Sequence, residues 1–384
     1  MRSDNPQNMK IMIIAGEASG DLHGSNLVRE MLSLNQNLSF YGIGGERLRE
    51  KGVKLVAHSA DMAVVGLTEV FSKLGFILKV RRQLMKSLRE SPPDLLILID
   101  YPDFNMPLAK TAKKYGIKVF YYISPQVWAW RKKRKYNLEK TVDSMAVILP
   151  FEEEIYRDVD LDVRFVGHPL LDVMGQVYTK EESSKKCGLN PHATTVAMLP
   201  GSRKNEIRKL LPEMLRASVM LKDKIPDCQF ILPLADTLTM NDLSHYIGQC
   251  PLDIAVIERD TYDAIACADG AMVASGTATL ETALLEVPMI IVYKISPLSY
   301  MLGRMCIGVD NIGLVNIIAG KTVAPEFIQG EVDAGKMAEE VFHILTDTAR
   351  KTAIKTELKR VKEKLGEPGA AQRAAAMAVK LLQG

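Results

Sequence analysis

Asp100 follows an apolar run of the sequence, LLILI at residues 95–99, and lies three residues before Asp103. A carboxylate at the mouth of an apolar strand is partly desolvated, which raises its pKa and makes it a better general base near neutral pH. Asp100 is therefore a candidate catalytic base. Capping of the next turn is an equally good interpretation of Asp100, and it suits Asp103 better.

An earlier loop, AGEASGD at residues 15–21, places Glu17, Ser19 and Asp21 where a first apolar strand would turn into a first helix. Open α/β sheets bind ligands at such strand ends. The loop has neither the GxGxxG spacing of dinucleotide-binding loops nor the GK[ST] of phosphate-binding loops. A nucleotide phosphate is therefore not its automatic ligand.

The stretch LPGSR at residues 199–203 runs from an apolar segment directly into an amphipathic helical pattern. The first N–H groups of a helix attract anions, Ser202 adds a hydroxyl, and the guanidinium of Arg203 can form two hydrogen bonds to a phosphate. The alternative is an ordinary helix cap with a solvated arginine. We favour a diphosphate site, because Gly-Ser-Arg directly after a strand suits an anion better than a plain cap.

A second strand end of this kind is SGTATLE at residues 275–281. The hydroxyls of Ser275, Thr277 and Thr279, together with the first N–H groups of the helix, could bind a diphosphate. Glu281, one turn further along, could accept hydrogen bonds from both hydroxyls of a ribose. In the alternative interpretation, Thr277 and Glu281 are helix residues favoured by the dipole. Strand ends of one doubly wound sheet converge on one crevice, which favours a shared ligand.

Residues 128–135, WAWRKKRK, combine both tryptophans of the chain, Trp128 and Trp130, with five consecutive basic residues. This combination suits phosphorylated headgroups at a membrane surface or a nucleic-acid backbone, and the contact would involve Arg131, Lys132 and Arg134. The usual alternative is a solvated helix face. Residues 63–88 form a second amphipathic segment, which is more commonly a core helix but can present an apolar face to acyl chains or a bilayer.

The composition is that of a globular enzyme, with 384 residues, 47% hydrophobic and 25% charged residues, and a formal net charge of +3. Such a charge is too small to imply nucleic acid by itself. The five cysteines show no CxxC spacing, which favours a reducing compartment and argues against a zinc site. Without an apolar leader or a run of about 20 apolar residues, we expect a cytoplasmic protein that does not cross a membrane. We expect no metal and no cofactor.

Apolar runs of strand length alternate with helical patterns along the chain, as in βαβ units. Several runs are apolar throughout, which is typical of parallel strands buried on both faces. The pattern continues to about residue 169 and restarts after residue 191, and the chain exceeds the usual size of one core. We therefore predict two tandem doubly wound, Rossmann-like α/β domains joined near residues 167–177. The segment from residue 334 is helical in pattern, without a sign of where it packs.

Nine collinear segments resemble the lipid-A-disaccharide synthase family of membrane-associated glycosyltransferases. They are AGEASGD (15–21), VGLTEV (65–70), IDYPDFN (99–105), SPQVWAW (124–130), LPFE (149–152), FVGHPL (165–170), LPGSR (199–203), SGTATLE (275–281) and VNIIAG (315–320). The resemblance implies the glycosyltransferase B architecture, with an interdomain cleft and a C-terminal helix that returns to the N-terminal domain. It implies an acceptor and membrane-facing domain of residues 1–170, completed by about 350–384, and a UDP-sugar donor domain of residues 171–349.

The reaction implied by the resemblance joins UDP-2,3-diacylglucosamine to 2,3-diacylglucosamine 1-phosphate, giving a β(1→6) disaccharide and UDP. Because the donor bond is α and the product bond β, the reaction inverts configuration, which needs a base and stabilisation of the leaving diphosphate. By resemblance Asp100 is the base, and Arg203 with the helix start at Thr277 stabilises the diphosphate. Glu281 would hold the uridine ribose, and Asn316 would be a further donor-site residue.

In the same scheme Glu17 orients the acceptor sugar, with Ser19 and Asp21 beside it. The protein would be peripheral on the cytoplasmic face of the inner membrane, where the 128–136 segment meets an anionic surface or the acceptor phosphate. Nucleic acid is not an expected partner, and a homo-oligomer is possible. Two alternatives stay open: a UDP-N-acetylhexosamine 2-epimerase, which shares the architecture, and a non-catalytic peripheral lipid- or nucleotide-binding protein.

Overall fold

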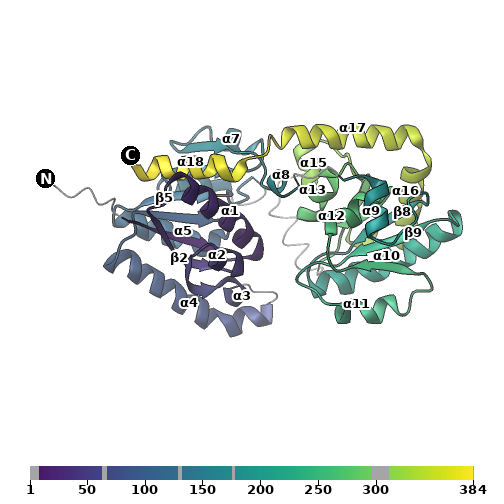
Figure 1. Cartoon of the computed structure of the whole chain (residues 1–384), viewed down its shortest axis with the longest axis horizontal. Helices are drawn as coiled ribbons and strands as arrows, with labels where there is room; N and C mark the ends of the chain where they lie inside the picture. Colours follow the sequence, from purple (N-terminus) through teal and green to yellow (C-terminus); the bar gives the residue numbers. More distant parts are fainter. Residues whose placement is uncertain (1–7, 63–66, 129–131, 175–177, 296–310, 384) are drawn as a thin grey trace. The chain divides into compact units, whose positions relative to one another are not determined.

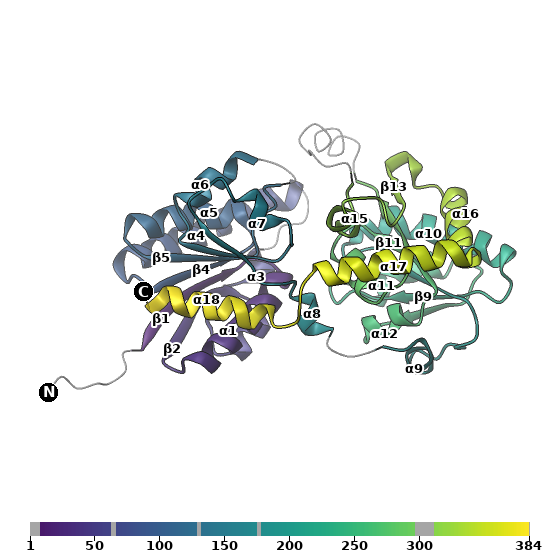
Figure 2. The same cartoon turned by 90° about the horizontal axis from the view of Figure 1, so that it is seen from above.

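The computed structural model describes residues 8–62, 67–128, 132–174, 178–295 and 311–383. The chain forms two compact units, Met1–Val173 with Leu365–Gly384, and Met174–Lys364 (Figures 1 and 2). Each unit contains one parallel β-sheet with helices on its faces, so the predicted pair of α/β domains is confirmed. Among the described helices, none combines the length and the apolar character that crossing a bilayer requires.

The sheet of the first unit has the strand order β3-β2-β1-β4-β5-β6-β7, and all neighbouring strands are parallel. Its strands are β1 (Met9–Ala15), β2 (Leu38–Gly44), β3 (Lys54–His58), β4 (Leu95–Ile99), β5 (Lys118–Tyr122), β6 (Ser144–Val147) and β7 (Asp162–Phe165). The order of strands reverses between β1 and β4. In doubly wound sheets, ligands bind beyond the carboxyl ends of the strands at this point.

Both faces of this sheet are buried, because alternate residues of β1 enter different cores. Ile11 and Ile13 pack with α1 and α18, whereas Met12 and Ile14 pack with α4 and α5. This explains why the strands are apolar throughout rather than alternating. The helices of the unit are α1 (Ala18–Leu34), α2 (Glu46–Glu50), α3 (Ser59–Met62), α4 (Leu67–Glu90), α5 (Pro102–Lys114), η1 (Lys132–Arg134), α6 (Lys135–Glu139), α7 (Glu152–Ile155), α8 (Leu170–Val173) and α18 (Ala370–Gln383).

The last helix, α18, lies beside α1 on the first unit, although the second unit separates the two in sequence (Figures 1 and 2). Its inner face is made of small residues, including the fully buried Ala374 and Ala378, which allow the two helices to approach closely. The carboxylate of Asp172 accepts hydrogen bonds from the backbone N–H groups of Ala370 and Ala371, at 3.3 and 3.1 Å. Asp172, which lies just before the chain enters the second unit, thereby caps the start of α18 after the chain has returned.

The sheet of the second unit has the order β10-β9-β8-β11-β12-β13, again entirely parallel. Its strands are β8 (Thr195–Leu199), β9 (Gln229–Pro233), β10 (Ile254–Ile257), β11 (Gly270–Ala274), β12 (Met289–Tyr293) and β13 (Glu326–Ile328). The order reverses between β8 and β11, so the second unit repeats the topology of the first six strands of the first. Its helices are α9 (Lys180–Lys186), α10 (Lys204–Lys224), α11 (Met240–Ile247), α12 (Thr261–Ala266), α13 (Thr277–Leu284), α15 (Leu314–Ala319), η2 (Gln329–Glu331), α16 (Ala334–Thr346) and α17 (Thr348–Lys364).

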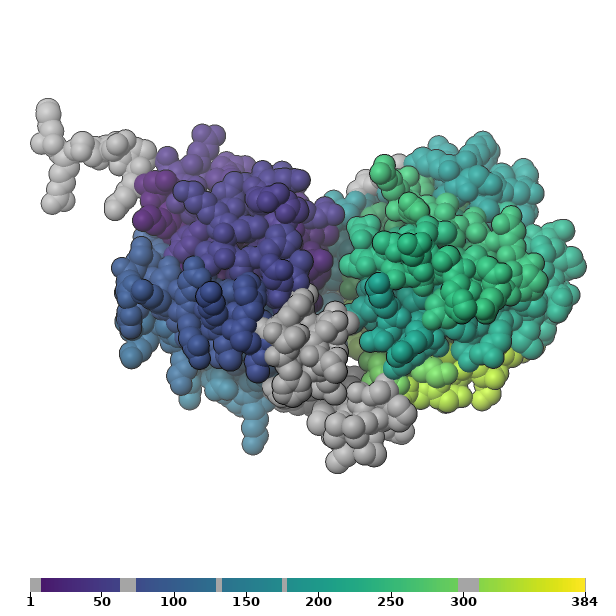
Figure 3. Space-filling view, turned by 90° about the horizontal axis from the view of Figure 1, so that it is seen from below, coloured from purple at the N-terminus to yellow at the C-terminus, as the bar shows by residue number. Residues whose placement is uncertain are grey.

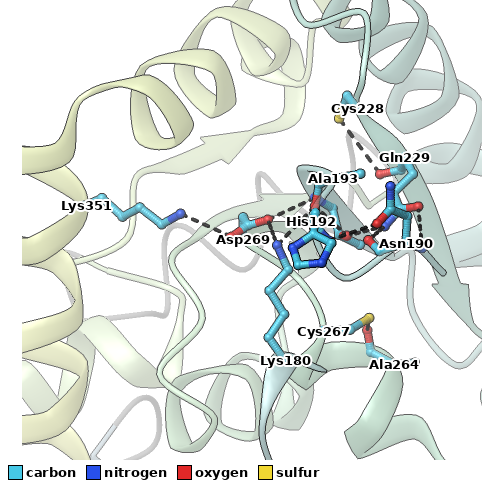
Figure 4. Close-up of polar contacts among 11 residues, drawn as sticks. Lys180, Asn190, His192, Ala193, Cys228, Gln229, Ala264, Cys267, Asp269 and Lys351 are labelled. Atoms are coloured by element: carbon cyan, nitrogen blue, oxygen red, sulfur yellow. Dashed lines mark hydrogen bonds and ion pairs between the residues drawn. The ribbon is translucent and has the colours of Figure 1, made fainter. Parts of the chain in front are cut away.

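Helix α17 belongs to the second unit, Met174–Lys364. Figure 4 shows Lys351 of α17 and Lys180 of α9 converging on Asp269, just before β11; the Nζ–Oδ distances are 3.3 and 2.6 Å. At the other end of the helix, Lys364 Nζ donates to the backbone oxygen of Ile318 at 3.1 Å. The return to the first unit therefore begins at Leu365 rather than near residue 350.

Candidate functional site

The loops that follow β1 and β4 leave the first sheet side by side, because Ala15 pairs with Ile99 at the ends of these strands. The Tyr101 ring lies so close to Gly16 that a Cβ on this glycine would be 2.3 Å from a ring carbon. Only glycine permits this approach. The close contact explains the first glycine of the AGEASGD loop, Gly16, and brings Glu17 into the neighbourhood of Asp100.

Asp100 and Tyr101 both have left-handed backbone conformations, with φ of +43° and +49°. This conformation is unfavourable for side chains other than glycine and persists only where the surroundings enforce it, which is common at functional sites. Two hydrogen bonds to the backbone oxygen of Asp100 provide the restraint. The side-chain Nδ2 of Asn105 and the phenol of Tyr121 each donate to it at 2.6 Å. The backbone is thus held so that the carboxylate leaves the strand end at a fixed position.

Burial, together with a smaller effect of the nearby negative charge of Glu17, raises the pKa of Asp100 to about 6. At pH 7 and above the carboxylate is mostly ionised, yet it is a stronger base than an ordinary aspartate. The side chain of Glu17 itself is exposed. These two carboxylates are the part of the first unit best suited to proton abstraction from a hydroxyl and to hydrogen bonding with a sugar.

Asp21 has a structural role, although the sequence analysis placed it with the acceptor. Its carboxylate is 5% exposed and accepts hydrogen bonds from the backbone N–H groups of Gly45, Arg47 and Leu48, at 2.6 to 3.1 Å. It thereby caps the start of α2. Ser19 is exposed in the first turn of α1, and the structure gives it no such internal role.

A cavity of about 360 Å³ lies at the carboxyl ends of β8, β9 and β11 in the second unit. It brings together four residues predicted for the donor, Ser202, Arg203, Thr277 and Glu281, which come from two separate stretches of sequence. Ser275 also lines it, but its hydroxyl donates to the backbone oxygen of Ile312 at 3.2 Å. The convergence of two strand ends agrees with the sequence prediction for a doubly wound sheet.

At the start of α10, the backbone N–H groups that were predicted to bind an anion already donate to a carboxylate of the protein, that of Glu206. Glu206 Oε2 accepts hydrogen bonds from the N–H groups of Ser202 and Arg203, at 2.9 and 3.2 Å, and Glu206 Oε1 lies 3.3 Å from the Arg203 guanidinium. This arrangement is a capping interaction. The Arg203 side chain is still 61% exposed, so its guanidinium can turn toward a bound diphosphate.

Helix α13 offers a more open helix start. Gly276 precedes it with φ of +154°, and Thr277 and Ala278 of its first turn line the cavity. Glu281 stands one turn further along and is half-buried, and burial raises its pKa above the usual range. The phenol of Tyr262 donates to Glu281 Oε1 at 3.4 Å. Anion-binding N–H groups and a carboxylate are thus combined in one cavity.

Thr279 and Asn316 use their polar groups inside the protein instead of at the cavity. Thr279 is fully buried, and its hydroxyl donates to the backbone oxygen of Gly276 at 2.8 Å. Asn316 is also fully buried. Its Nδ2 donates to Ala324 O and Glu326 Oε1, at 2.7 and 2.8 Å, and its Oδ1 accepts from the N–H groups of Val323 and Ala324, at 2.8 and 2.9 Å. Asn316 therefore holds the turn between α15 and β13.

The predicted basic and aromatic interface is only partly described. Trp128 is 8% exposed and packs edge-on against Phe151 at a centroid distance of 5.3 Å, so its ring is a core group and does not face a membrane. Arg134 is 13% exposed in its side chain and pairs with Asp103. Trp130 and Arg131 lie outside the described residues, as does the side chain of Lys132.

Two residues at these sites, Tyr262 and Glu206, were not among those predicted from the sequence. Tyr262 follows β10 with no distinctive spacing, and only its contact with Glu281 identifies it. Glu206 was visible as an acidic residue three positions after Arg203, which is a capping signal. Among the described residues, no group of three or more histidine, cysteine, aspartate or glutamate side chains is arranged to hold a metal ion.

The two doubly wound units have the fold of the B-type glycosyltransferases. The solved structure of the kitacinnamycin glycotransferase aligns with a TM-score of 0.65 at 15% identity, covering 98% of this chain and 100% of that chain. The UDP-GlcNAc 2-epimerase of Neisseria meningitidis, bound to UDP-GlcNAc, aligns with a TM-score of 0.60 at 11% identity, covering 98% and 100%. At these identities the similarity shows the fold alone.

Sequence similarity identifies the family within this class. The chain belongs to the lipid-A-disaccharide synthetase family, which it matches over residues 11–381. The lipid-A-disaccharide synthase of Syntrophus aciditrophicus is 56% identical over 374 residues, covering 97% of this chain and 98% of the relative. The resemblance found in the nine sequence segments is confirmed.

Proposed function

We propose that this protein is an inverting hexosyltransferase that joins UDP-2,3-diacylglucosamine to 2,3-diacylglucosamine 1-phosphate, forming the β(1→6) lipid A disaccharide 1-phosphate and UDP. The observation that carries the proposal is family membership over nearly the whole chain. The sites support it with the half-buried carboxylate of Asp100 in one unit and a cavity that contains the start of helix α13 in the other. The epimerase alternative rests only on a shared fold, since that relative is distant in sequence.

In this mechanism the two units divide the chemistry. In the first unit, Asp100 accepts the proton of the attacking 6-hydroxyl while that oxygen displaces UDP from the anomeric carbon, which inverts its configuration. In the second unit, Arg203 and the N–H groups at Thr277 stabilise the charge that develops on the leaving diphosphate. Glu281 accepts hydrogen bonds from the ribose hydroxyls.

The decisive experiment measures UDP release by the purified protein, given the donor sugar nucleotide with and without the acylated acceptor, in the presence of EDTA. We expect release that depends on the acceptor and yields a disaccharide 1-phosphate by mass spectrometry. Conversion of UDP-N-acetylglucosamine to its 2-epimer, without any acylated acceptor, would instead identify the epimerase. No turnover of either substrate by folded protein would favour a binding protein.

The loop residue Glu17 provides a graded test of the acceptor site. We expect the Glu17→Gln substitution to lower turnover by about 10- to 100-fold, because an amide replaces a carboxylate that hydrogen bonds to sugar hydroxyls. Because Glu17 raises the pKa of Asp100, the acidic limb of the pH–rate profile should also move to lower pH. Turnover within a few-fold of wild type would make the loop structural.

We also propose that the first unit contacts the cytoplasmic face of the inner membrane through α4. The side chains of Leu74 and Phe76 are each 42% exposed on this helix, and the basic residues Lys79 and Arg82 are exposed further along it. Figure 3 views the first unit, coloured from purple to blue, from the side on which α4 lies. Exposed apolar groups with basic residues nearby occur on helices that lie in a membrane interface. Because residues two positions apart point to different sides of a helix, one of Leu74 and Phe76 inserts when α4 lies flat on the surface.

Substitution of both apolar residues tests this membrane contact. We expect Leu74→Ser with Phe76→Ser to weaken binding to vesicles with anionic lipid by at least about 10-fold, because each side chain contributes about 1.5 kcal/mol or more when buried. The matched control is Leu34→Ser on α1, a residue that is 52% exposed, which should leave binding unchanged. Equal flotation of the double variant and wild type would rule out α4 as the contact.

A further inference from the structure

Tyr262 lies behind Glu281 when seen from the donor cavity. Glu281 and Thr261 line the cavity, whereas Tyr262 is not one of its lining residues. The phenol nevertheless reaches the carboxylate, with Oη 3.4 Å from Glu281 Oε1. This is the one hydrogen bond found for the Glu281 carboxylate among the described residues, so the remaining acceptor positions of Glu281 are free for a ligand.

The helix that carries Tyr262 is anchored independently of the cavity. Asp263, the next residue, is 5% exposed and accepts hydrogen bonds from Ser183 Oγ at 2.8 Å and Lys186 Nζ at 3.1 Å, both on α9. At its start, Asp260 has a left-handed conformation with φ of +60°. The contacts of Asp263 tie α12 to α9, so the phenol of the neighbouring Tyr262 is held in place beside Glu281.

We propose that Tyr262 is a positioning residue for the donor, whose phenol holds Glu281 in the orientation in which the carboxylate accepts both hydroxyls of the ribose. This inference rests on the proposed function, because it assumes that the cavity takes the nucleoside diphosphate of a sugar nucleotide. Without the phenol, no hydrogen bond among the described residues would hold the Glu281 carboxylate in one of its staggered conformations.

The same hydrogen bond also affects the charge of Glu281. Burial raises the pKa of Glu281, and the Tyr262 phenol opposes this by stabilising the carboxylate. The pKa of Tyr262 lies far above neutral, raised by burial and by Glu281, so the phenol keeps its proton and remains a donor. A protonated Glu281 would lose half of its acceptor capacity toward a diol.

The test compares binding of UDP and of 2′,3′-dideoxy-UDP to the full chain by calorimetry. The wild type should bind UDP at least about 10-fold more tightly than the dideoxy compound, since hydrogen bonds to a charged group stabilise binding. In the Tyr262→Phe variant, UDP affinity should fall about 5- to 10-fold while affinity for the dideoxy compound stays within about two-fold. The UDP affinity of this variant should also weaken at a higher pH than in the wild type as the pH is lowered.

The matched control is Tyr246→Phe on α11, which removes a phenol that does not line the cavity and should keep the wild-type preference. An unchanged preference in Tyr262→Phe would overturn the inference, as would an equal loss for both nucleotides, which indicates a collapsed cavity. A wild type that binds UDP without preferring it to the dideoxy compound would remove Glu281 from the ribose site but leave the proposed reaction standing. A folded wild type that binds no UDP would refute the proposed function itself.

Discussion

The Asp100→Asn variant is expected to release UDP about 10²- to 10⁴-fold more slowly than the wild type at pH 7.5, because the amide cannot accept a proton from the attacking hydroxyl. UDP binding should be unchanged, since the donor cavity is formed by the second unit. In the wild type, burial and Glu17 raise the pKa of Asp100 to about 6, so the rate should fall about tenfold per pH unit below this value.

A matched control for this substitution is Asp103→Asn, three residues along the same loop, where the carboxylate is 70% exposed. It should change turnover by less than a few-fold. Equal losses in the two variants, with normal folding, would show that the loop needs its shape more than it needs a base. Turnover retained by Asp100→Asn would assign the base to another residue.

The Asp100→Asn substitution should also make the protein more stable at neutral pH. A folded-state pKa raised from 3.8 to about 6 means that the ionised Asp100 disfavours the folded state. This destabilisation develops as the pH rises from about 4 to about 6 and is complete above it, reaching on the order of 3 kcal/mol. The melting temperature of Asp100→Asn should therefore exceed that of the wild type at pH 7.5 and match it near pH 4. Stability given up at a catalytic position is common.

Replacement of Asn316 by alanine should destabilise the second unit by about 4 kcal/mol, because four hydrogen bonds of a fully buried side chain are lost together. The backbone N–H groups of Val323 and Ala324 would remain buried without these partners. Calorimetric or chemical unfolding of the full chain measures the loss. Asn316→Asp should be similarly harmful, because it places a second carboxylate against Glu326.

The control for Asn316 is Asn311→Ala, which removes a single exposed hydrogen bond from Thr322 Oγ1, at 3.2 Å. This variant should lose less than about 1 kcal/mol. If Asn316→Ala unfolds like the wild type but no longer binds UDP, the internal hydrogen bonds matter little and Asn316 contacts the donor, as the family resemblance implied.

The fold was predictable because its signals are local and repeated. Uniformly apolar runs such as 11–15 and 95–99 require strands buried on both faces, and both are central strands of the first sheet. The destination of the last segment was not readable from local pattern, because an alanine-rich helix fits many surfaces. Its place on α1 depends on small residues meeting a specific partner helix.

Site residues were harder to predict than elements, since one residue type serves both caps and ligands. Asp21 and Thr279 were reasonable candidates by type and position, yet their oxygens satisfy backbone groups or bond internally. Asp100 and Glu281 differ in being half-buried with a raised pKa at a strand end or a cavity. Whether a side-chain oxygen bonds inside the protein or is free for a ligand depends on which segments, distant in sequence, pack against it. The spacing of residues along the sequence does not reveal that packing.

The return of α18 to the first unit bears on how the protein is synthesised. Residues 174–364 leave the ribosome as one uninterrupted segment, so the second unit can fold while the chain is still attached. The first unit emerges earlier, but α18, which covers one face of its sheet together with α1, is missing until residues 370–383 follow. A chain that ends prematurely after Lys364 would leave the part of that apolar face beneath α18 uncovered. Residues 370–383 are thus translated after the whole of the second unit, and they complete the first unit, which was begun before it.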